Sequence, residues 1–584
     1  MSMLKRPTLR YNAFLLIHPP AAKACEAPGG PMRLAGALRR HGVSCRVWDA
    51  NLEGQLRLME EGRRIGDPAA GENAPGKRIW DFVDSGTPAG KMSAACCSAE
   101  EGGEVPGGGK RAAIQHSEMV GQPSSADLRG NGTDAWTRRA ARHLAGNLVA
   151  LRSYELYGNS DRYRRAVTDL NRLLAAAARP YGVRLSLADY EDERLSPVRS
   201  ADLFHAAAAP ETNPFYPWFR GRLPEILAEI PVSQVGFSLN YLSQALTTFA
   251  MIGFLRRAFP KVRIVLGGGL VTSWIRRPGW KNPFAGLVDE LIAGPGEIPL
   301  LALLGHEHDG GPDRPDISGF RLADYLSPGA VLPYSASSGC WWRRCSFCPE
   351  RAERNPYRPF PTAQVTADLR TLVAETKPAL IHLLDNALSP SLLDALAANP
   401  PGAPWYGFSR ILPRLADPGF CRILRDSGCV MLKLGMESGD PAVLAALNKG
   451  IDLPTAAAAL KNLKAAGIAT YVYLLFGTPA ETPEAAQRTL TFTAEHAEEI
   501  GFLNLAIFNL PAWGPDGELL DTGEFYKGDL SLYRPFSHPQ GWNRGDVRRF
   551  LEREFKRRPA VAAILRRDPP FFTSNHAPFF TFAG

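Results

Sequence analysis

The sequence predicts an α/β chain of two domains, a doubly wound parallel sheet followed by a partial barrel of six β/α units. Two observations carry this prediction. Short apolar segments alternate with helical segments along much of the chain, and glycine-rich turns follow several of the apolar segments. With 584 residues and 45% hydrophobic content, the chain is long enough for more than one core and too apolar to be disordered throughout.

The first domain is expected at residues 1–310, and its elements follow the β/α order of a doubly wound sheet. Its predicted elements are a strand at 13–17, a helix at 32–41, a strand at 44–48, a strand at 234–239, a helix at 245–259, a strand at 263–266 and a short strand at 290–293. A large insertion at 55–230 interrupts this pattern. Its Gly- and Ser-rich part, 102–132, predicts a disordered loop, and apolar spacing over 136–177 predicts helices that serve as scaffold or substrate lid.

The barrel is expected at residues 325–510, and the remainder, 511–584, forms a C-terminal extension with a basic helix at 544–567. Six apolar segments predict the barrel strands: 331–336, 380–384, 405–409, 431–436, 470–476 and 502–508.

Cysteine usage and charge limit the cellular setting and the partners. The cysteine count, 9, is odd and low, which predicts a reducing compartment, and the cytoplasm is expected. We expect no signal peptide and no transmembrane segment, because no apolar run reaches the length of a spanning helix. The net charge of +8 is concentrated in the basic helix. Such a helix is usually a solvated face, so no nucleic-acid partner is expected.

Three cysteines follow the first predicted barrel strand, at the sheet edge where strand ends face a shared pocket. Cys340, Cys345 and Cys348 lie within 9 residues and can hold one metal centre. Structural zinc normally takes four closed ligands, and no fourth Cys or His follows at such a spacing. An iron–sulfur cube with three cysteine ligands leaves one iron free to bind a small chelating molecule. The alternatives are a zinc knot or three incidental thiols.

This loop resembles the cluster-binding loop of radical S-adenosylmethionine (SAM) enzymes, which has three cysteines spaced CxxxCxxC and an aromatic residue before the last. Phe347 fills the aromatic position, whereas four residues, not three, separate Cys340 from Cys345. The motifs GMESGD at 435–440 and LFGTPAET at 475–482 are similar to strand ends of the same superfamily. The resemblance spans roughly residues 331–501.

The resemblance implies that the three cysteines ligate a 4Fe-4S cluster whose open iron chelates SAM. It places Glu437 at the ribose hydroxyls, Ser409 or Arg410 at the carboxylate, and Asp385 with Asn386 at the amino group. For the last four residues, a strand-end cap is the alternative. The full expected SAM set is Phe347, Asp385, Asn386, Ser409, Arg410, Glu437 and Ser438.

The strand-end segments 49–54 and 238–241 and the three glycines at 267–269 resemble those of the cobalamin-binding domain that often precedes a radical SAM barrel. The expected cobalamin set is Asp49, Asn51, Gly54, Ser238, Gly267, Gly268 and Gly269. Asn51 stands where related domains carry a cobalt-ligating histidine, so the resemblance implies cobalamin with no histidine on its lower face. Glycines give the nucleotide tail room for close approach. The alternative is a Rossmann-like domain that no longer holds cobalamin.

These resemblances imply an enzyme in which a reduced 4Fe-4S cluster cleaves SAM to a 5'-deoxyadenosyl radical that abstracts hydrogen from a substrate carbon. Methyl transfer from cobalamin to that carbon is the expected outcome. Ring closure, rearrangement or carbon–carbon bond formation without methyl transfer is the alternative. A non-catalytic iron–sulfur or cobalamin sensor is the alternative from another class. An external reductant such as flavodoxin or ferredoxin is expected, and the substrate, whether small molecule, lipid or peptide, stays unidentified.

Overall fold

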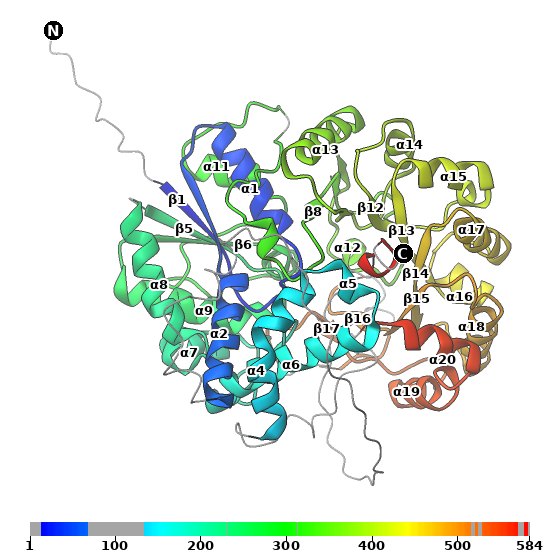
Figure 1. Ribbon diagram of the computed structural model, residues 1–584, viewed down its shortest axis with the longest axis horizontal. Helices are drawn as coiled ribbons and strands as arrows, with labels where there is room; N and C mark the ends of the chain where they lie inside the picture. The colour runs from blue at the N-terminus through cyan, green and yellow to red at the C-terminus, as the bar shows by residue number, and fades with distance from the viewer. Residues whose placement is uncertain are drawn as a thin grey trace, which may run out of the picture.

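The computed structural model describes residues 13–67, 134–230, 232–311, 313–514, 520–523, 528–569 and 577–581. Within them, two parallel sheets lie side by side, each with helices packed against it (Figure 1). The α/β class and the two sheets are therefore confirmed. The loop predicted at 102–132 lies outside the described residues.

The first sheet contains five parallel strands in the order β2-β1-β5-β6-β7. The chain adds β2 on one side of β1 and then adds β5, β6 and β7 on the other side, so the strand order reverses between β1 and β5. Ligands of such sheets bind at this point, outside the carboxyl ends of the strands. The strands are β1 (Ala13–His18), β2 (Cys45–Asp49), β5 (Val232–Ser238), β6 (Arg263–Gly267) and β7 (Glu290–Leu291). The flanking helices are α1 (Gly29–Arg40), α9 (Leu242–Ala258), α10 (Gly269–Ile275) and α11 (Glu297–Leu303).

Residue 55, where the insertion is predicted to begin, lies inside a helix, α2 (Ala50–Gly66). The Asp49 side chain caps this helix by accepting from the Leu52 amide at 3.0 Å. The helices predicted at 136–177 are confirmed as three helices, of which α4 and α6 pack against α2. The insertion elements are α4 (Ala135–Leu151), α5 (Tyr154–Tyr157), α6 (Ser160–Ala178), β3 (Val183–Leu185), β4 (Tyr190–Asp192), α7 (Ser200–Ala208) and α8 (Tyr216–Glu229).

The second sheet contains six parallel strands in sequential order, β8-β11-β12-β13-β14-β15, which confirms the partial barrel. Its strands are β8 (Val331–Tyr334), β11 (Leu380–Leu383), β12 (Trp405–Ser409), β13 (Cys429–Glu437), β14 (Ala469–Phe476) and β15 (Phe502–Ile507). The helices that follow them are α13 (Thr362–Thr376), α14 (Pro390–Ala398), α15 (Pro418–Asp426), α16 (Pro441–Ala446), α17 (Leu453–Ala465) and α18 (Pro483–Glu495). Leu432 and Leu434 share a core with Leu460 of α17, whereas Met431 packs with Tyr406 on the opposite face, which we call the inner face.

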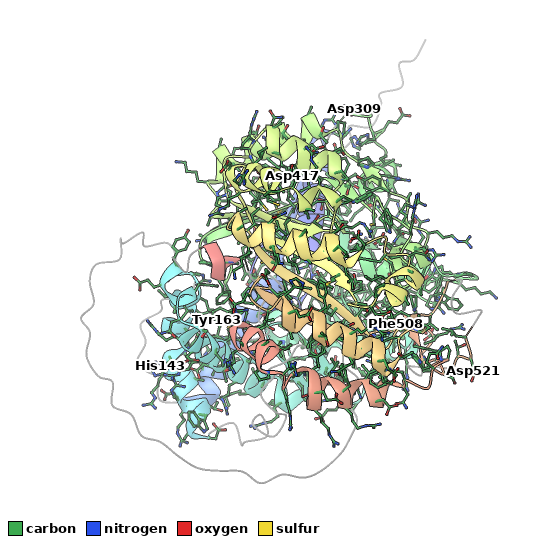
Figure 2. All side chains as sticks on the ribbon, turned by 90° about the vertical axis from the view of Figure 1, so that its right-hand side faces the viewer. His143, Tyr163, Asp309, Asp417, Phe508 and Asp521 are labelled. Atoms are coloured by element: carbon green, nitrogen blue, oxygen red, sulfur yellow. The ribbon has the colours of Figure 1, made fainter. Side chains whose placement is uncertain are left out.

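A helix of the C-terminal extension packs at the amino-terminal end of the inner face and also contacts the insertion. Phe579 of α21 (Pro578–Thr581) joins the inner-face cluster. The same ring lies 4.9 Å from Tyr157 and 4.8 Å from Tyr163, between ring centroids. The insertion helices therefore lie at one flank of the barrel, where Figure 2 labels Tyr163. The basic segment forms α19 (Arg544–Phe550), a π-helical turn (Leu551–Phe555) and α20 (Pro559–Arg567). No helix in the described part of the chain is long and apolar enough to span a membrane.

Candidate active site

The three cysteines occupy one loop at the carboxyl end of β8. Two short strands, β9 (Ser337–Ser338) and β10 (Arg358–Pro359), pair antiparallel and close the base of this loop. Cys340, Cys345 and Cys348 are all free thiols and partly buried. The Ser346 amide donates to the Leu447 carbonyl at 3.0 Å, so the loop is fastened to the segment that follows β13. All three thiols are thereby held at the carboxyl edge of the barrel.

Arg410 links this loop to the end of β12. Its Nη1 lies 3.8 Å from Sγ of Cys345, and its guanidinium carbon lies 3.9 Å from the centroid of a Trp342 ring. The Trp342 indole donates to the Asn448 carbonyl at 3.1 Å. A Cβ on Gly450 would lie 2.5 Å from Trp342, and Gly450 has a φ of +63°, so only glycine fits beneath the indole. Trp342 therefore packs between Arg410 and the 448–450 turn.

Glu437 and Lys449 form a buried ion pair beside the same loop. Lys449 Nζ lies 2.7 Å from Glu437 Oε1, and the two residues are 4% and 8% exposed. Glu437 ends β13 with a φ of +70°, a conformation that turns its side chain out of the strand register. Nζ of Lys449 also lies 5.7 Å from the centroid of the Phe347 ring. The carboxylate therefore lies beside the loop, in contact with the lysine ammonium.

The electrostatic surroundings of Cys345 combine burial with cations. Burial raises the pKa of Cys345, and Lys449 and Arg410 oppose that rise. Burial also raises the pKa of Cys348 to about 11. Metal binding requires thiolates, which nearby cations favour. Arg410 and Lys449 are thus placed to favour a negatively charged centre on these sulfurs.

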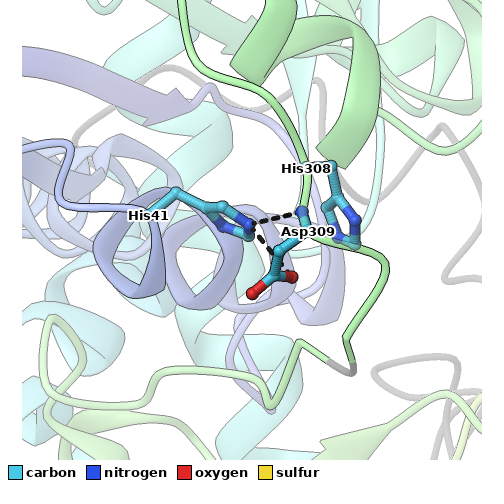
Figure 3. A group of neighbouring side chains, drawn as sticks. All are labelled: His41, His308 and Asp309. Carbon is cyan, nitrogen blue, oxygen red and sulfur yellow. Dashed lines mark hydrogen bonds and ion pairs between the residues drawn. The ribbon is translucent and has the colours of Figure 1, made fainter.

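Another grouping also has metal-ligand side chains. Within the described ranges, only His41, His308 and Asp309 form a set of three His, Cys, Asp or Glu ligand atoms that all lie within 4.8 Å of one another (Figure 3). The ring nitrogens of these histidines are engaged. His41 Nδ1 donates to a carbonyl of α1 at 2.8 Å, and its Nε2 accepts from the Asp309 amide at 3.3 Å. His308 Nε2 pairs with the Asp313 carboxylate at 2.7 Å, and its Nδ1 accepts from a loop amide at 3.0 Å. This group fastens a loop to the end of α1.

The spacing of the three cysteine sulfurs argues against a single metal ion. One tetrahedral ion at about 2.3 Å from each sulfur would hold the sulfurs roughly 3.8 Å apart. The three sulfurs of Cys340, Cys345 and Cys348 do not all lie within 4.8 Å of one another. In this arrangement the three sulfurs are therefore too far apart to hold one tetrahedral ion together.

Three of the expected SAM residues are committed to local structure. Asp385 is buried, accepts from the Ala336 amide at 3.0 Å and also bonds the Ser337 hydroxyl, so it shapes the entry to the cysteine loop. The buried Ser409 hydroxyl donates to the Arg410 carbonyl at 2.9 Å. The buried Ser438 hydroxyl lies 3.1 Å from that of Thr489. For Asp385 and Ser409 the contacts are those of the strand-end cap.

The remaining expected residues lie closer to the loop. Asn386 is exposed and forms a hydrogen bond with Glu350, which follows Cys348 by two residues. Phe347 packs against the apolar cluster Val443, Leu447 and Ala485. The structure thus brings the cysteines, Arg410, Phe347 and Glu437 together.

At the first sheet, the residues expected to bind cobalamin divide into two groups. Ser238 ends β5 and is buried, Gly267 ends β6, and Gly268 and Gly269 follow that strand. Gly268 has a φ of +111°, and a Cβ there would lie 2.3 Å from the Leu239 carbonyl oxygen. Neither Gly267 nor Gly269 has a neighbouring atom closer than 3.4 Å to such a Cβ. These glycines therefore leave a small-residue edge at the carboxyl end of the sheet.

The other group is packed within the domain. The Asn51 side chain is 1% exposed and accepts from the Ala22 amide at 2.7 Å and from Gln55 at 2.8 Å. Asp49 bonds the hydroxyl of Tyr325. A Cβ on Gly54 would lie 2.9 Å from Trp218 of α8. Asn51 therefore holds the loop after β1, and Gly54 allows α2 and α8 to approach.

Lys449 is a site residue that the sequence analysis does not predict. The sequence feature that could have indicated it is a lysine shortly after the motif glutamate, Glu437, on a segment that returns to the end of β13. The ring contact between Arg410 and Trp342 joins residues far apart in sequence, and no local pattern indicates it.

Parts of the chain are similar to known proteins. Residues 334–493 match the Radical SAM superfamily profile. No curated protein matches the chain. The radical S-adenosylmethionine methyltransferase TsrM from Kitasatospora setae, solved with cobalamin and a [4Fe-4S] cluster bound, aligns with a TM-score of 0.40 and 19% identity over 51% of this chain and 65% of that chain. The cobalamin-dependent S-adenosylmethionine radical enzyme OxsB, with aqua-cobalamin bound, aligns with a TM-score of 0.37 and 14% identity over 47% of this chain and 45% of that one. The alignments thus span less than two thirds of these two proteins.

Proposed function

Because residues 334–493 form a Radical SAM superfamily domain, we propose that this chain is a radical SAM enzyme that abstracts hydrogen from a substrate carbon. The observation that carries the proposal is the convergence of three thiols, Arg410 and the Glu437–Lys449 pair at the carboxyl edge of one parallel sheet. Strand ends of this kind present catalytic groups to a shared pocket. The chemistry of the donor set fits an iron–sulfur cluster, because three thiolates leave one iron open.

Each residue has a defined part in this proposal. Cys340, Cys345 and Cys348 hold the cluster, and a reduced cluster, when bound, supplies the electron that cleaves SAM into methionine and a 5'-deoxyadenosyl radical. Glu437 accepts hydrogen bonds from the ribose hydroxyls through its buried carboxylate, which Lys449 contacts and positions. Arg410 stabilises negative charge on the Cys345 side. An external protein reductant delivers the electron.

Methyl transfer through cobalamin is the finer part of the proposal. The switch point between β1 and β5 lies at the carboxyl edge that carries Ser238 and Gly267–Gly269. The small-residue edge suits a flat cofactor that approaches the backbone. Asn51 holds a loop through its amide oxygen, so we propose that no side chain of β2–α2 ligates cobalt. The structures of TsrM and OxsB hold bound cobalamin, so the assay includes cobalamin.

The test is anaerobic incubation of the reconstituted protein with SAM, a strong reductant and cobalamin, followed by mass spectrometry of the nucleoside products. Formation of 5'-deoxyadenosine supports the radical step. Formation of S-adenosylhomocysteine that depends on cobalamin supports methyl transfer. Formation of 5'-deoxyadenosine without S-adenosylhomocysteine favours cyclisation or rearrangement. If a protein with an intact cluster forms neither product, with or without candidate substrates, the enzyme proposal fails in favour of a sensor.

A further inference from the structure

A pocket opens where the first sheet, the cysteine loop and the C-terminal extension meet. One wall follows α10, a second is α12 (Pro349–Ala352), which begins directly after Cys348, and the third belongs to the C-terminal extension. The space between the walls measures about 500 Å³, with the solvent at its mouth included. It can therefore admit a small molecule beside the cysteine loop. Its charged and large aromatic lining residues are Arg276, Arg277, Glu353, Trp513 and Tyr533.

The aromatic wall is held by a short two-stranded ladder. β16 (Leu510–Pro511) pairs antiparallel with β17 (Tyr533–Arg534). The centroid of the Trp513 ring, which follows β16, lies 5.2 Å from the guanidinium carbon of Arg277 and equally far from that of Arg534. A guanidinium over an indole ring is attracted to it electrostatically. Trp513 therefore fixes the Arg277 guanidinium at the wall of the pocket.

The Arg276 side chain has no such anchor. Among the residues that the structure describes, its guanidinium makes no hydrogen bond, ion pair or ring contact. Its Nη2 lies 3.7 Å from the position of a Cβ built on Gly294, in the turn after β7. Arg276 therefore reaches from the pocket toward the carboxyl end of the first sheet, with its N–H donors open to a ligand.

Positive charge exceeds negative charge at this pocket. Arginine stays protonated in proteins, even where burial lowers the pKa, as it does for Arg277. Glu353 is the one carboxylate among the described lining residues, and it accepts from the Asn355 amide at 3.0 Å. Asp529, outside the lining, acts electrostatically on Arg277 and offsets part of its charge. The charge of Arg276 is left for a bound anion to neutralise.

We propose that Arg276, supported by Arg277, binds the carboxylate or phosphate of the substrate in this pocket. A guanidinium presents parallel N–H donors that match the oxygens of either group. The wall formed by α12 directly follows Cys348, so a molecule anchored at Arg276 lies against the cysteine loop. That this anion is the substrate rests on the proposed function, whereas anion binding is testable alone.

The experiment is calorimetric titration of the full-length, cluster-loaded protein without SAM or reductant. The probes are benzoate and phenyl phosphate, and benzamide is the neutral analogue of benzoate. We expect saturable binding of at least one anion and none of benzamide, and the tighter anion identifies the group that the pocket prefers. Cobalamin also carries a phosphate, so each titration is repeated on protein loaded with hydroxocobalamin. Anion binding that persists supports the substrate assignment, and its loss on loading overturns that assignment in favour of the cofactor.

Two variants in the pocket should change anion affinity in opposite directions. Arg276→Gln should weaken it at least about tenfold, as loss of a charged hydrogen bond predicts, with an unchanged unfolding midpoint. Glu353→Gln keeps an acceptor for Asn355 but removes the lining carboxylate, so it should tighten anion binding. Arg422→Gln, at an exposed arginine of α15, is the matched control and should behave as the parent protein.

Three results would each overturn the anion site at Arg276. They are equal anion affinity in Arg276→Gln and the parent, equal binding of benzamide, and no saturable binding of either anion by the folded protein. Because the titration contains no SAM, these results leave the proposed radical chemistry untouched. Conversely, a protein that binds the anions but forms no 5'-deoxyadenosine would keep the site and lose the proposed function.

Discussion

Lys449 and Glu437 face each other at 2.7 Å in a buried position beside the cysteine loop. The Lys449 backbone carbonyl also accepts a hydrogen bond from Arg410, the residue whose other nitrogen reaches Cys345. One turn of chain therefore neutralises the expected ribose-binding carboxylate and holds the guanidinium beside the expected cluster ligand. Burial makes each charge dependent on its partner.

Replacing Lys449 with methionine should leave the Glu437 carboxylate buried without a counter-charge. We expect the free energy of unfolding to fall by about 3 to 5 kcal/mol and SAM affinity to fall with it. Glu437→Gln should weaken SAM binding at a smaller stability cost. Denaturant unfolding and calorimetric SAM titration of the cluster-loaded protein measure the two effects. Lys464→Met, which breaks an exposed pair with Glu498 at 3.4 Å, should change neither quantity. Normal SAM affinity in Glu437→Gln would contradict the ribose assignment.

Replacing Cys345 with serine should remove a cluster ligand. We expect the reconstituted protein to lose most of its bound iron and sulfide and to form no 5'-deoxyadenosine, because the thiolate is required for ligation. Iron and sulfide analysis and product mass spectrometry measure these losses. Cys421→Ala provides the control, since Cys421 is buried on α15, away from the loop. Equal iron content in the Cys345 and Cys421 variants would refute the cluster assignment.

The barrel was predictable because fully buried parallel strands are continuous apolar runs. The strand expected at 405–409 is observed at Trp405–Ser409. The strand expected at 431–436 is observed at Cys429–Glu437, slightly longer at both ends. No helix is predicted from the sequence at 50–66, where α2 lies. The Asp49 cap and the buried apolar side of 50–66 make this segment helical.

The site was predictable only in its local parts. The cysteine spacing and Glu437 lie in motifs, and the structure brings them together. The long-range contact that tunes them, Arg410 on Trp342, joins residues far apart in sequence. Such contacts depend on tertiary packing, which no sequence period encodes.

Replacing Gly268 with valine should damage the small-residue edge of the first sheet. Its φ of +111° disfavours any side chain, and a Cβ would lie 2.3 Å from the Leu239 carbonyl oxygen. We expect loss of cobalamin retention on gel filtration, measured by absorbance of the protein fraction, while the cluster in the barrel is kept. Gly279→Val is matched, because Gly279 also has a positive φ of +68° but no atom within 4 Å of a Cβ. Full cobalamin retention in the folded Gly268 variant would count against the proposed edge.

Glu481 gives a prediction for the pH dependence of stability. The residue is 0% exposed and accepts hydrogen bonds from the Gly477 amide and from the Trp542 indole, the latter at 3.1 Å, while its second oxygen has no partner within the described residues. Burial raises the pKa of Glu481 from 4.5 to about 7. The unfolded chain therefore releases this proton at lower pH than the folded chain does.

Because the folded state binds more protons between pH 4.5 and about 7, Glu481 lowers the free energy of unfolding as the pH rises through that window. The shift corresponds to about 3 kcal/mol by pH 8, where both states are ionised. Glu481→Gln keeps an acceptor for the amide and the indole but removes the titration. We expect the variant to unfold at a higher temperature than the parent protein at pH 8, and the difference to shrink toward pH 5. The exposed neighbour Glu484, replaced by glutamine, should show no such gain. A difference between the Glu481 variant and the parent that is constant with pH would show that the carboxyl is already ionised in the folded chain.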